Sequence, residues 1–219
     1  MTTQSNEIQR TIVQSDFDGT ITVEDVSFMI LDAFADGDWR SLLKAYRESK
    51  ISVNHFNAEA FGMVKADKPT LADFAINTMR IRDGFHKLID SCKRMGFRFV
   101  IVSNGLDFYI KAILQDIGLD DIEVLAARTK FVSDSLNVAY IGPDGNQMEN
   151  GFKEAHTKSF LDNGYRVIYL GNGISDIPAA RHAQHVFATG ELRAYYDKTN
   201  TNYLPFTDLN DVALALEQL

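Results

Sequence analysis

The chain has 219 residues, 45% of them hydrophobic and 24% charged, which suits a globular fold with a sizeable core and excludes disordered or collagen-like classes. Its formal charge of −8 disfavours nucleic acid as a partner, because no basic stripe offsets it. The single cysteine excludes an intrachain disulfide, and no apolar stretch reaches the roughly 20 residues that span a bilayer. The first residues, MTTQSNEIQR, lack the apolar run of a signal peptide, so we expect a cytoplasmic protein.

The N-terminal third predicts one strand followed by an insert of helices. Residues 11–16 are predicted to form a short strand that leads into a turn at Asp18 and Gly19. From residue 24 to about residue 80 the apolar residues follow helical spacing, interrupted by turn-forming and capping residues. We therefore expect four short helices within residues 21–81.

Strands and helices alternate over the remainder of the chain. The expected order is an amphipathic helix that begins after residue 84 and ends at Gly96, strand 97–103, helix 107–117, strand 122–126, a hairpin-like stretch 128–145, helix 153–163, strand 166–170, helix 176–183, strand 185–188 and a last helix 208–218. Recurring βα units indicate a mainly parallel sheet covered by helices. The predicted fold class is α/β, with a three-layer Rossmann-like core.

Polar residues follow three of the predicted strands, where functional sites of parallel sheets lie. The first strand leads into Asp16-Phe17-Asp18-Gly19-Thr20, the second into Ser103-Asn104-Gly105, and a later one into Gly171-Asn172-Gly173 with Asp176 shortly after. These three strand ends are expected to form one site.

The motif Asp-Phe-Asp-Gly-Thr after an apolar strand resembles the first motif of the haloacid dehalogenase superfamily. Ser103 resembles the hydroxyl of the second motif, and Lys153, which lies 18 residues before Gly171, resembles the lysine of the third. Residues 171–176 resemble the acidic fourth motif. Because the four motifs occur in family order across the core, the chain is identified as a member of this superfamily.

The resemblance implies a Mg²⁺-dependent phosphatase that forms an aspartyl phosphate. A carboxylate can attack a phosphoryl group only when cations neutralise the phosphate, and Mg²⁺ prefers hard oxygen ligands. Asp16 would be the nucleophile, Asp18 the general acid and base, and Lys153 the balancing cation. The implied site residues are Asp16, Asp18 and Lys153 for catalysis; Ser103, Asn104, Gly105 and Lys153 for phosphate binding; and Asp16, Asp18, Asn172 and Asp176 for Mg²⁺.

One departure from the family pattern is Asn172, where aspartate is usual. An amide oxygen can coordinate Mg²⁺ but carries no formal charge, so we expect weaker metal binding. The departure leaves a catalytically impaired protein that binds a phosphorylated metabolite as an alternative, and a phosphotransferase or mutase is another. Lys158 is a competing lysine, but the spacing to the fourth motif favours Lys153, and Lys158 is expected to be exposed on the helix. His182 and His185 lack a third zinc ligand.

The helical insert resembles the small cap of this superfamily, which implies a cap at 21–81, a catalytic core at 1–20 and 82–219, and a short β flap near 126–148. Such a cap is expected to enclose a small phosphorylated metabolite as the substrate. The protein is expected to be a monomer or a homodimer. The motifs resemble the phosphoserine-phosphatase-like branch, although residues 54–65 lack the arginine of that pattern. Further similarity to the methionine-salvage phosphatases of the same branch occurs in these segments: 61–63, 81–85, 105–108 and 204–208.

Overall fold

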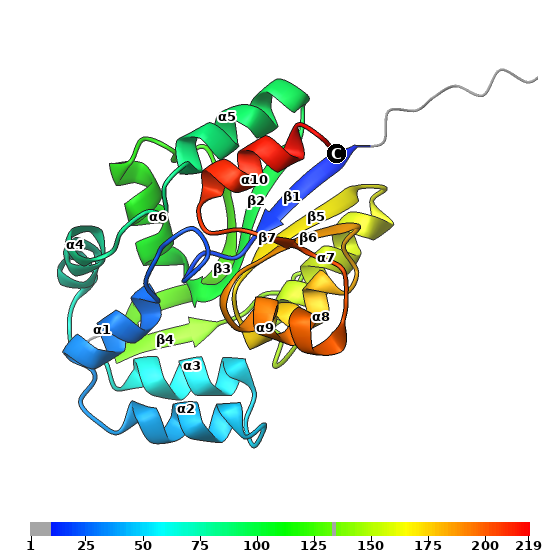
Figure 1. Cartoon of the computed structure of the whole chain (residues 1–219). Helices are drawn as coiled ribbons and strands as arrows, with labels where there is room; N and C mark the ends of the chain where they lie inside the picture. Colours follow the sequence, from blue (N-terminus) through cyan, green and yellow to red (C-terminus); the bar gives the residue numbers. More distant parts are fainter. Residues whose placement is uncertain (1–9, 133–134) are drawn as a thin grey trace, which may run out of the picture.

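The computed structural model describes residues 10–132 and 135–219 (Figure 1). The expectation about a signal peptide, the first nine residues of the predicted core and two residues of the predicted hairpin lie outside these described residues. Within the described part of the chain, no helix is long and apolar enough to cross a membrane.

Seven strands form one sheet, and β1 lies at its centre. The strands are β1 (Thr11–Ser15), β2 (Arg98–Leu106), β3 (Glu123–Val132), β4 (Ser135–Ala139), β5 (Arg166–Gly171), β6 (His185–Ala188) and β7 (Leu204–Pro205), in the spatial order β4-β3-β2-β1-β5-β6-β7. All neighbouring pairs are parallel except β3 with β4. Every residue of β1 is buried, as expected for a strand covered on both faces. The predicted mainly parallel sheet is confirmed.

Two layers of helices enclose the sheet. They comprise α5 (Phe85–Met95), α6 (Asp107–Asp116), α7 (Phe152–Asp162), α8 (Ile177–Ala180), α9 (Gly190–Thr199) and α10 (Leu209–Leu216). Helices α5, α6 and α10 lie on one side, and α7, α8 and α9 lie on the other (Figure 1). This arrangement follows from right-handed connections that run outward from β1 in both directions, and it confirms the predicted three-layer α/β class.

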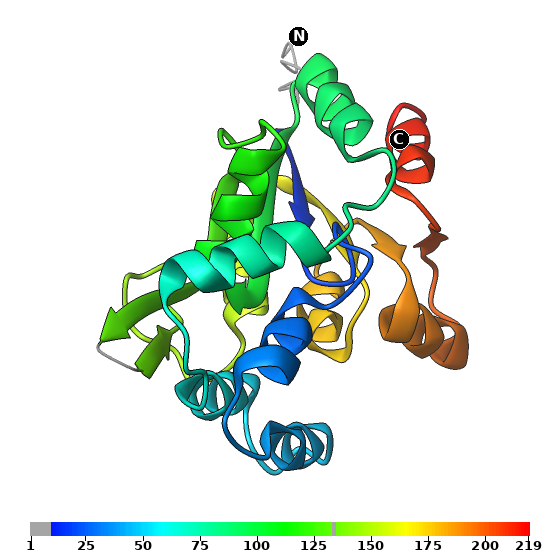
Figure 2. The same cartoon turned by 90° about the vertical axis from the view of Figure 1, so that its left-hand side faces the viewer.

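Four further helices separate β1 from α5: α1 (Val26–Phe34), α2 (Trp39–Arg47), α3 (Val53–Gly62) and α4 (Lys68–Thr78). Each begins at a side-chain cap, in chain order Asp25, Asp38, Ser52 and Asp67, which accepts a hydrogen bond from a backbone N–H of the first turn. Helices α2 and α3 lie at the opposite end of the molecule from α5 and α10 (Figures 1 and 2). The division of the chain into core and cap stays a prediction.

Aromatic contacts join α1 to α2 and to α4. The rings of Phe28 and Trp39 have centroids 5.3 Å apart, and those of Phe34 and Phe74 are 5.1 Å apart. The chain enters and leaves the insert side by side, through a bridge between Thr22 and Ile81. The insert therefore has its own apolar contacts, and two adjacent chain segments connect it to the rest of the protein.

The structure differs from the sequence expectation in three places. The predicted helix 176–183 is a 3₁₀ turn, Ile174–Asp176, followed by the single turn of α8. Helix α9 and strand β7 have no predicted counterpart. The hairpin pairs β3 with β4 directly, while the turn at 143–145 closes a separate bridge between Ile141 and Gln147.

Candidate active site

The ends of β1, β2 and β5 surround a cavity of about 140 Å³. Because these neighbouring strands are parallel, their carboxyl ends lie at the same edge of the sheet. All the predicted site residues except Asp176 line this cavity: Asp16, Asp18, Ser103, Asn104, Gly105, Lys153 and Asn172. Asp176 is fully buried behind the cavity wall.

Lys153 forms a buried cluster with two carboxylates. Its Nζ atom lies 2.9 Å from Asp16 Oδ2 and 2.6 Å from Asp176 Oδ1. Burial lowers the pKa of Lys153, but the two carboxylates raise it above its usual value on balance. Burial raises the pKa of Asp16 to about 6, although Lys153 opposes this. At neutral pH the cluster therefore contains a charged lysine beside an ionised Asp16.

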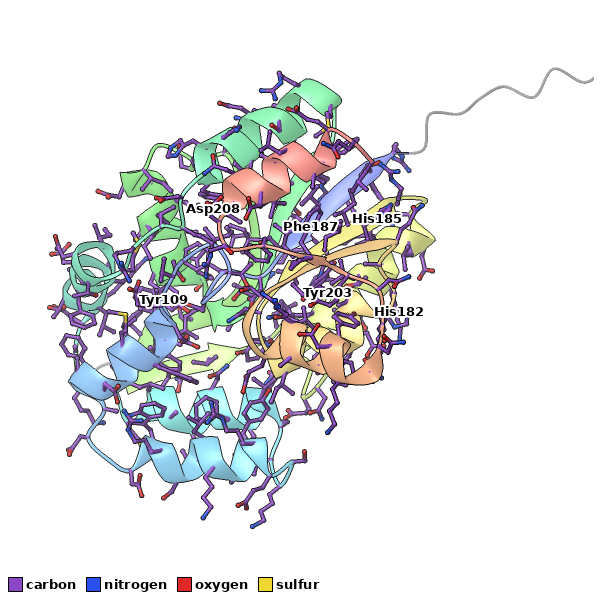
Figure 3. The ribbon with its side chains drawn as sticks, viewed as in Figure 1. Tyr109, His182, His185, Phe187, Tyr203 and Asp208 are labelled. Atoms are coloured by element: carbon purple, nitrogen blue, oxygen red, sulfur yellow. The ribbon has the colours of Figure 1, made fainter. Side chains whose placement is uncertain are left out.

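The side chain of Asp18 is held by two donors. Its Oδ1 atom accepts from the backbone N–H of Val26 at 3.0 Å, and its Oδ2 atom accepts from the Tyr109 hydroxyl at 2.5 Å. Tyr109 comes from α6 and lies on the side of the molecule that carries α1 (Figure 3). Burial, reinforced by the charge of Asp25, raises the pKa of Asp18 well above its usual range. Asp16 and Asp18 thus lie in different electrostatic environments despite their proximity in sequence.

The turn that contains Asp18 is fixed by an arginine that the sequence analysis missed. The guanidinium of Arg82 donates to the carbonyl oxygens of Gly19 and Thr20, each at 2.9 Å. Gly19 has a φ of +74°, and a Cβ atom there would lie 2.2 Å from Asn172 Nδ2. The glycine is therefore required both by backbone conformation and by the close approach of the 171–176 loop.

Asp176 organises the loop that follows β5. Its Oδ2 atom accepts from the backbone N–H groups of Asn172 and Gly173, at 2.9 and 2.8 Å. Its Oδ1 atom accepts from the Tyr169 hydroxyl at 2.7 Å, in addition to Lys153. These four contacts occupy the carboxylate, so its geometry fits a residue that orients the loop better than one that binds a ligand directly.

Residues 103–105 interrupt the pairing of β2 with β3. The pairing of β2 with β3 shifts register between Val102 and Leu106, so residues 103–105 face other partners. Gly105 donates its N–H to Ser103 Oγ at 3.0 Å. A Cβ atom on Gly105 would lie 2.1 Å from the Tyr109 hydroxyl oxygen and 2.3 Å from Asp18 Oδ2. Only glycine permits the β2 and β1 ends to approach this closely.

The insert helices supply the other wall of the cavity. Its apolar lining residues are Phe28, Leu43, Tyr46, Val53 and Phe56. Its polar lining residues from the insert are Asp25, Ser27, Arg47 and Asn57. Arg47 ends α2, outside the segment 54–65 in which the sequence analysis sought an arginine. Glu191, at the start of α9, also borders the cavity.

The oxygen atoms around the cavity fit a hard cation that keeps most of its water. Within residues 10–132 and 135–219, no three Asp, Glu, His or Cys side chains are grouped so that they could hold a metal ion. Asp16, Asp18 and Asn172, which the sequence analysis predicts as metal ligands, all line the cavity. Their predicted oxygen donors are mixed: the Asp16 carboxylate, the backbone carbonyl of Asp18 and the side-chain amide of Asn172. Asn172 Oδ1 also accepts from Thr20 Oγ1 at 3.0 Å. This donor set suits Mg²⁺, which needs few protein ligands.

The side chains that the sequence analysis set aside lie elsewhere. Lys158 is exposed and pairs with Glu154 at 2.7 Å. His182 Nε2 is hydrogen-bonded to the Oε1 atom of the same Glu154 at 2.8 Å. Figure 3 shows His182 and His185 on the opposite side of the molecule from Tyr109.

Tyr109 and Tyr169 were not predicted as part of the site. Both tyrosines are fully buried, and each hydroxyl donates to an aspartate of the motifs, Asp18 or Asp176. In sequence they look like ordinary core residues, because an aromatic ring on an apolar helix face or strand carries no sign of a polar partner. Only the spatial contact identifies them.

Comparisons with known proteins agree with this geometry. Residues 13–181 match the family of haloacid dehalogenase-like hydrolases. A protein of Geobacillus thermodenitrificans named 2-hydroxy-3-keto-5-methylthiopentenyl-1-phosphate phosphatase is 28% identical over 93% of this chain and 94% of its own length. A protein of the same name from Brevibacillus brevis is 25% identical over 96% and 97%.

Among solved structures, a phospho-aspartyl intermediate analogue of a phosphoserine phosphatase superposes with a TM-score of 0.67. The superposition covers 93% of this chain and 97% of the other, at 17% sequence identity. The similarity in fold therefore extends over most of the chain.

Proposed function

The chain belongs to the haloacid dehalogenase-like hydrolase family and is an enzyme of phosphatase type, and we propose that it hydrolyses a small phosphomonoester through an aspartyl phosphate on Asp16. The observation that carries the proposal is the convergence of Asp16, Asp18, Ser103 and Lys153 on one small cavity. An ionised carboxylate, a carboxyl of raised pKa and a buried ammonium are the groups that such a reaction needs.

In the proposed mechanism Asp16 attacks phosphorus in line with the leaving oxygen. Asp18 protonates the departing alkoxide, for which its raised pKa is suited. Water then attacks the phosphorus of the aspartyl phosphate and releases inorganic phosphate and the free Asp16 carboxylate. Asp18 accepts a proton from this water, which replaces the proton that it gave to the leaving alcohol. Ser103 and the neighbouring N–H groups bind the nonbridging oxygens, and Lys153 compensates the negative charge that accumulates beside Asp16.

A Mg²⁺ ion would be held by Asp16, the carbonyl of Asp18 and Asn172, and would neutralise phosphate charge when bound. Asp176 would act on this site from behind, by fixing the backbone that carries Asn172. We assign it that positioning role in preference to direct ligation, since its oxygens already accept four hydrogen bonds.

The substrate is proposed to be small. A cavity of about 140 Å³ lies below the 300–1,000 Å³ of sites for drug-sized ligands. Helices α1–α4 would act as a cap over the core. Their apolar side chains would contact a short uncharged part of the substrate. The methionine-salvage name of the bacterial relatives makes a phosphorylated keto-enol with a methylthio group the first candidate.

Arg47 favours a second candidate class, a phosphoester that also carries a carboxylate. Its side chain lines the cavity at the end of α2, where a guanidinium can pair with a carboxylate group of a ligand. The two substrate classes differ in the part of the substrate that is distant from the phosphate, which is uncharged in the first class and carries a carboxylate in the second. Arg47→Met should raise KM for the acidic class only.

The deciding experiment measures phosphate release from a panel of small phosphomonoesters with Mg²⁺ and with chelator. Asp16→Asn should abolish turnover, while Asp121→Asn, the same change at an exposed aspartate, should leave it intact. An acceptor alcohol in a parallel reaction detects phosphotransfer. Turnover that survives in Asp16→Asn would refute the mechanism, and phosphate binding without turnover in the unaltered protein would favour a binding protein.

A further inference from the structure

A closed ring of three hydrogen bonds joins helix α3 to the end of β2. Asn57 Nδ2 donates to the carbonyl oxygen of Asn104 at 3.0 Å and to the hydroxyl of Tyr140 at 2.5 Å. The Tyr140 hydroxyl donates in turn to the same Asn104 carbonyl at 2.5 Å. The three residues come from the insert, from β2 and from the segment that follows β4.

We propose that Asn57 and Tyr140 are positioning residues that orient the Ser103 hydroxyl towards the phosphate of the substrate, by way of the Asn104–Gly105 peptide. The inference rests on the proposed function. It adds that the position of α3 controls the orientation of the phosphate-binding residues.

Two side chains of this hydrogen-bonded ring are buried, which restrains its geometry. Asn57 is 5% exposed and Tyr140 is 2% exposed. Buried polar groups cost free energy unless they are hydrogen-bonded, so each member restrains the other two. The Asn104 carbonyl accepts two bonds, which uses both of its lone pairs. Rotation of that carbonyl would leave two buried donors without an acceptor.

The planarity of the peptide bond carries this restraint to Ser103. The C=O of Asn104 and the N–H of Gly105 belong to one trans peptide unit and therefore point in opposite directions. With the carbonyl fixed by the ring, the N–H is directed at Ser103 Oγ, 3.0 Å away. Since the Ser103 oxygen accepts this bond, its own hydroxyl proton is free to be donated into the cavity that Ser103 lines.

A purely structural fastening of α3 is the competing explanation, and Asn54 provides the control for it. Asn54 lies on the same helix, is as buried as Asn57, and donates to the backbone carbonyl of Met148 at 2.8 Å. It therefore fastens α3 to the core in a similar way. Asn54 is not among the residues that line the cavity, and its hydrogen bond leads to Met148, not to residues 103–105.

The test is a double-mutant cycle between Asn57→Ala and Ser103→Ala, with Asn54→Ala and Tyr140→Phe beside it. Each variant is measured by kcat and KM for the best phosphomonoester and by calorimetric titration with inorganic phosphate. A hydrogen bond to a charged group contributes about 1.5–3 kcal/mol, so Asn57→Ala and Ser103→Ala should each weaken phosphate binding and kcat/KM by about 10- to 100-fold.

In the double variant the loss should match that of Ser103→Ala alone, because Asn57 acts through the serine. Tyr140→Phe should shift the same parameters in the same direction. Asn54→Ala should stay within about threefold of the unaltered protein, because its hydrogen bond to Met148 does not restrain the Asn104 carbonyl. Thermal unfolding shows whether each variant is folded. Tyr140→Phe keeps the aromatic side chain and removes only the hydroxyl, so it serves as the test if Asn57→Ala does not fold.

Losses that multiply in the double variant, or an equal loss in Asn54→Ala, would overturn the inference. An unaltered protein that releases no phosphate from any ester but binds inorganic phosphate would refute the proposed hydrolysis alone. In that case the double-mutant cycle, measured by phosphate binding, would still test the role of Asn57 and Tyr140. A protein that binds no phosphate would refute both.

Discussion

The ammonium nitrogen of Lys153 lies 2.9 Å from the carboxylate of Asp16, and the side chains of both residues are buried. Removing one partner of a buried ion pair leaves an uncompensated charge, which costs about 3–5 kcal/mol. Lys153→Met should therefore lower the free energy of unfolding by that amount at pH 8 and should abolish turnover. Chemical denaturation of the metal-free protein measures the first effect.

Lys158→Met is the matched control for this prediction. Lys158 pairs with Glu154 one helical turn away, and its side chain is 53% exposed. Exposed pairs of this kind contribute about 0.3–0.5 kcal/mol. Equal destabilisation by the two lysine substitutions would contradict the assignment of Lys153 to a buried charge cluster.

Gly105→Ala should disable the site while leaving most of the fold in place. The added Cβ atom would lie 2.1 Å from the Tyr109 hydroxyl oxygen and 2.3 Å from Asp18 Oδ2, so both side chains must move. Because a displacement of about 1 Å can cost about 100-fold in rate, kcat should fall to that extent. Gly62→Ala, at a glycine with nothing within 4 Å of a Cβ atom, should leave kcat unchanged.

Asn172→Asp should tighten Mg²⁺ binding. The substitution adds a negative charge beside the donors of Asp16 and Asp18, and its oxygen can still accept the hydrogen bond from Thr20. We expect the dissociation constant of Mg²⁺ to fall about tenfold, or about 1.4 kcal/mol, by calorimetric titration. Asn202→Asp adds the same charge at an exposed position. Unchanged or weaker binding in Asn172→Asp would show that Asn172 is not a ligand.

Asp25→Asn should raise stability in a pH-dependent way. Burial raises the pKa of Asp25 from its ordinary 3.8 to about 6, so the folded state binds the proton more tightly than the unfolded state does. The stability that protonation contributes is complete below about pH 4 and is lost as the pH rises through about 6. The asparagine side chain stays neutral and can still cap α1.

The variant and the unaltered protein should therefore be equally stable at pH 3.5 and differ by about 1–3 kcal/mol at pH 7.5, since each pKa unit corresponds to about 1.4 kcal/mol. Urea denaturation in the presence of chelator measures both values. A constant difference across this pH range would indicate an effect on packing that is unrelated to titration.

Much of the fold could be predicted because its elements have local causes. Short apolar runs predict β1 and β5, and capping residues such as Ser52 predict helix starts. Helix α9 and strand β7 were missed for a different reason. The helix Gly190–Thr199 buries only Leu192 and Tyr196, which is too short an apolar pattern to identify it, and β7 has two residues.

The candidate site could be predicted only where its residues form a motif. Asp16, Asp18 and Lys153 were identified by their spacing and order, and their roles stay predictions. Arg47, Asn57 and Tyr140 belong to no motif, because each reaches the cavity or its loop from a separate element.

By itself, the sequence determined the family and the α/β class, since these follow from short motifs at the strand ends and from hydrophobic periodicity. Tertiary structure alone decided how the groups interact. It directed Asp176 to Lys153 and to the loop backbone, placed the Tyr109 hydroxyl on Asp18, and closed the ring between Asn57, Asn104 and Tyr140. Such contacts join residues up to 91 positions apart, and their free energy depends on distance and burial, neither of which a linear pattern contains.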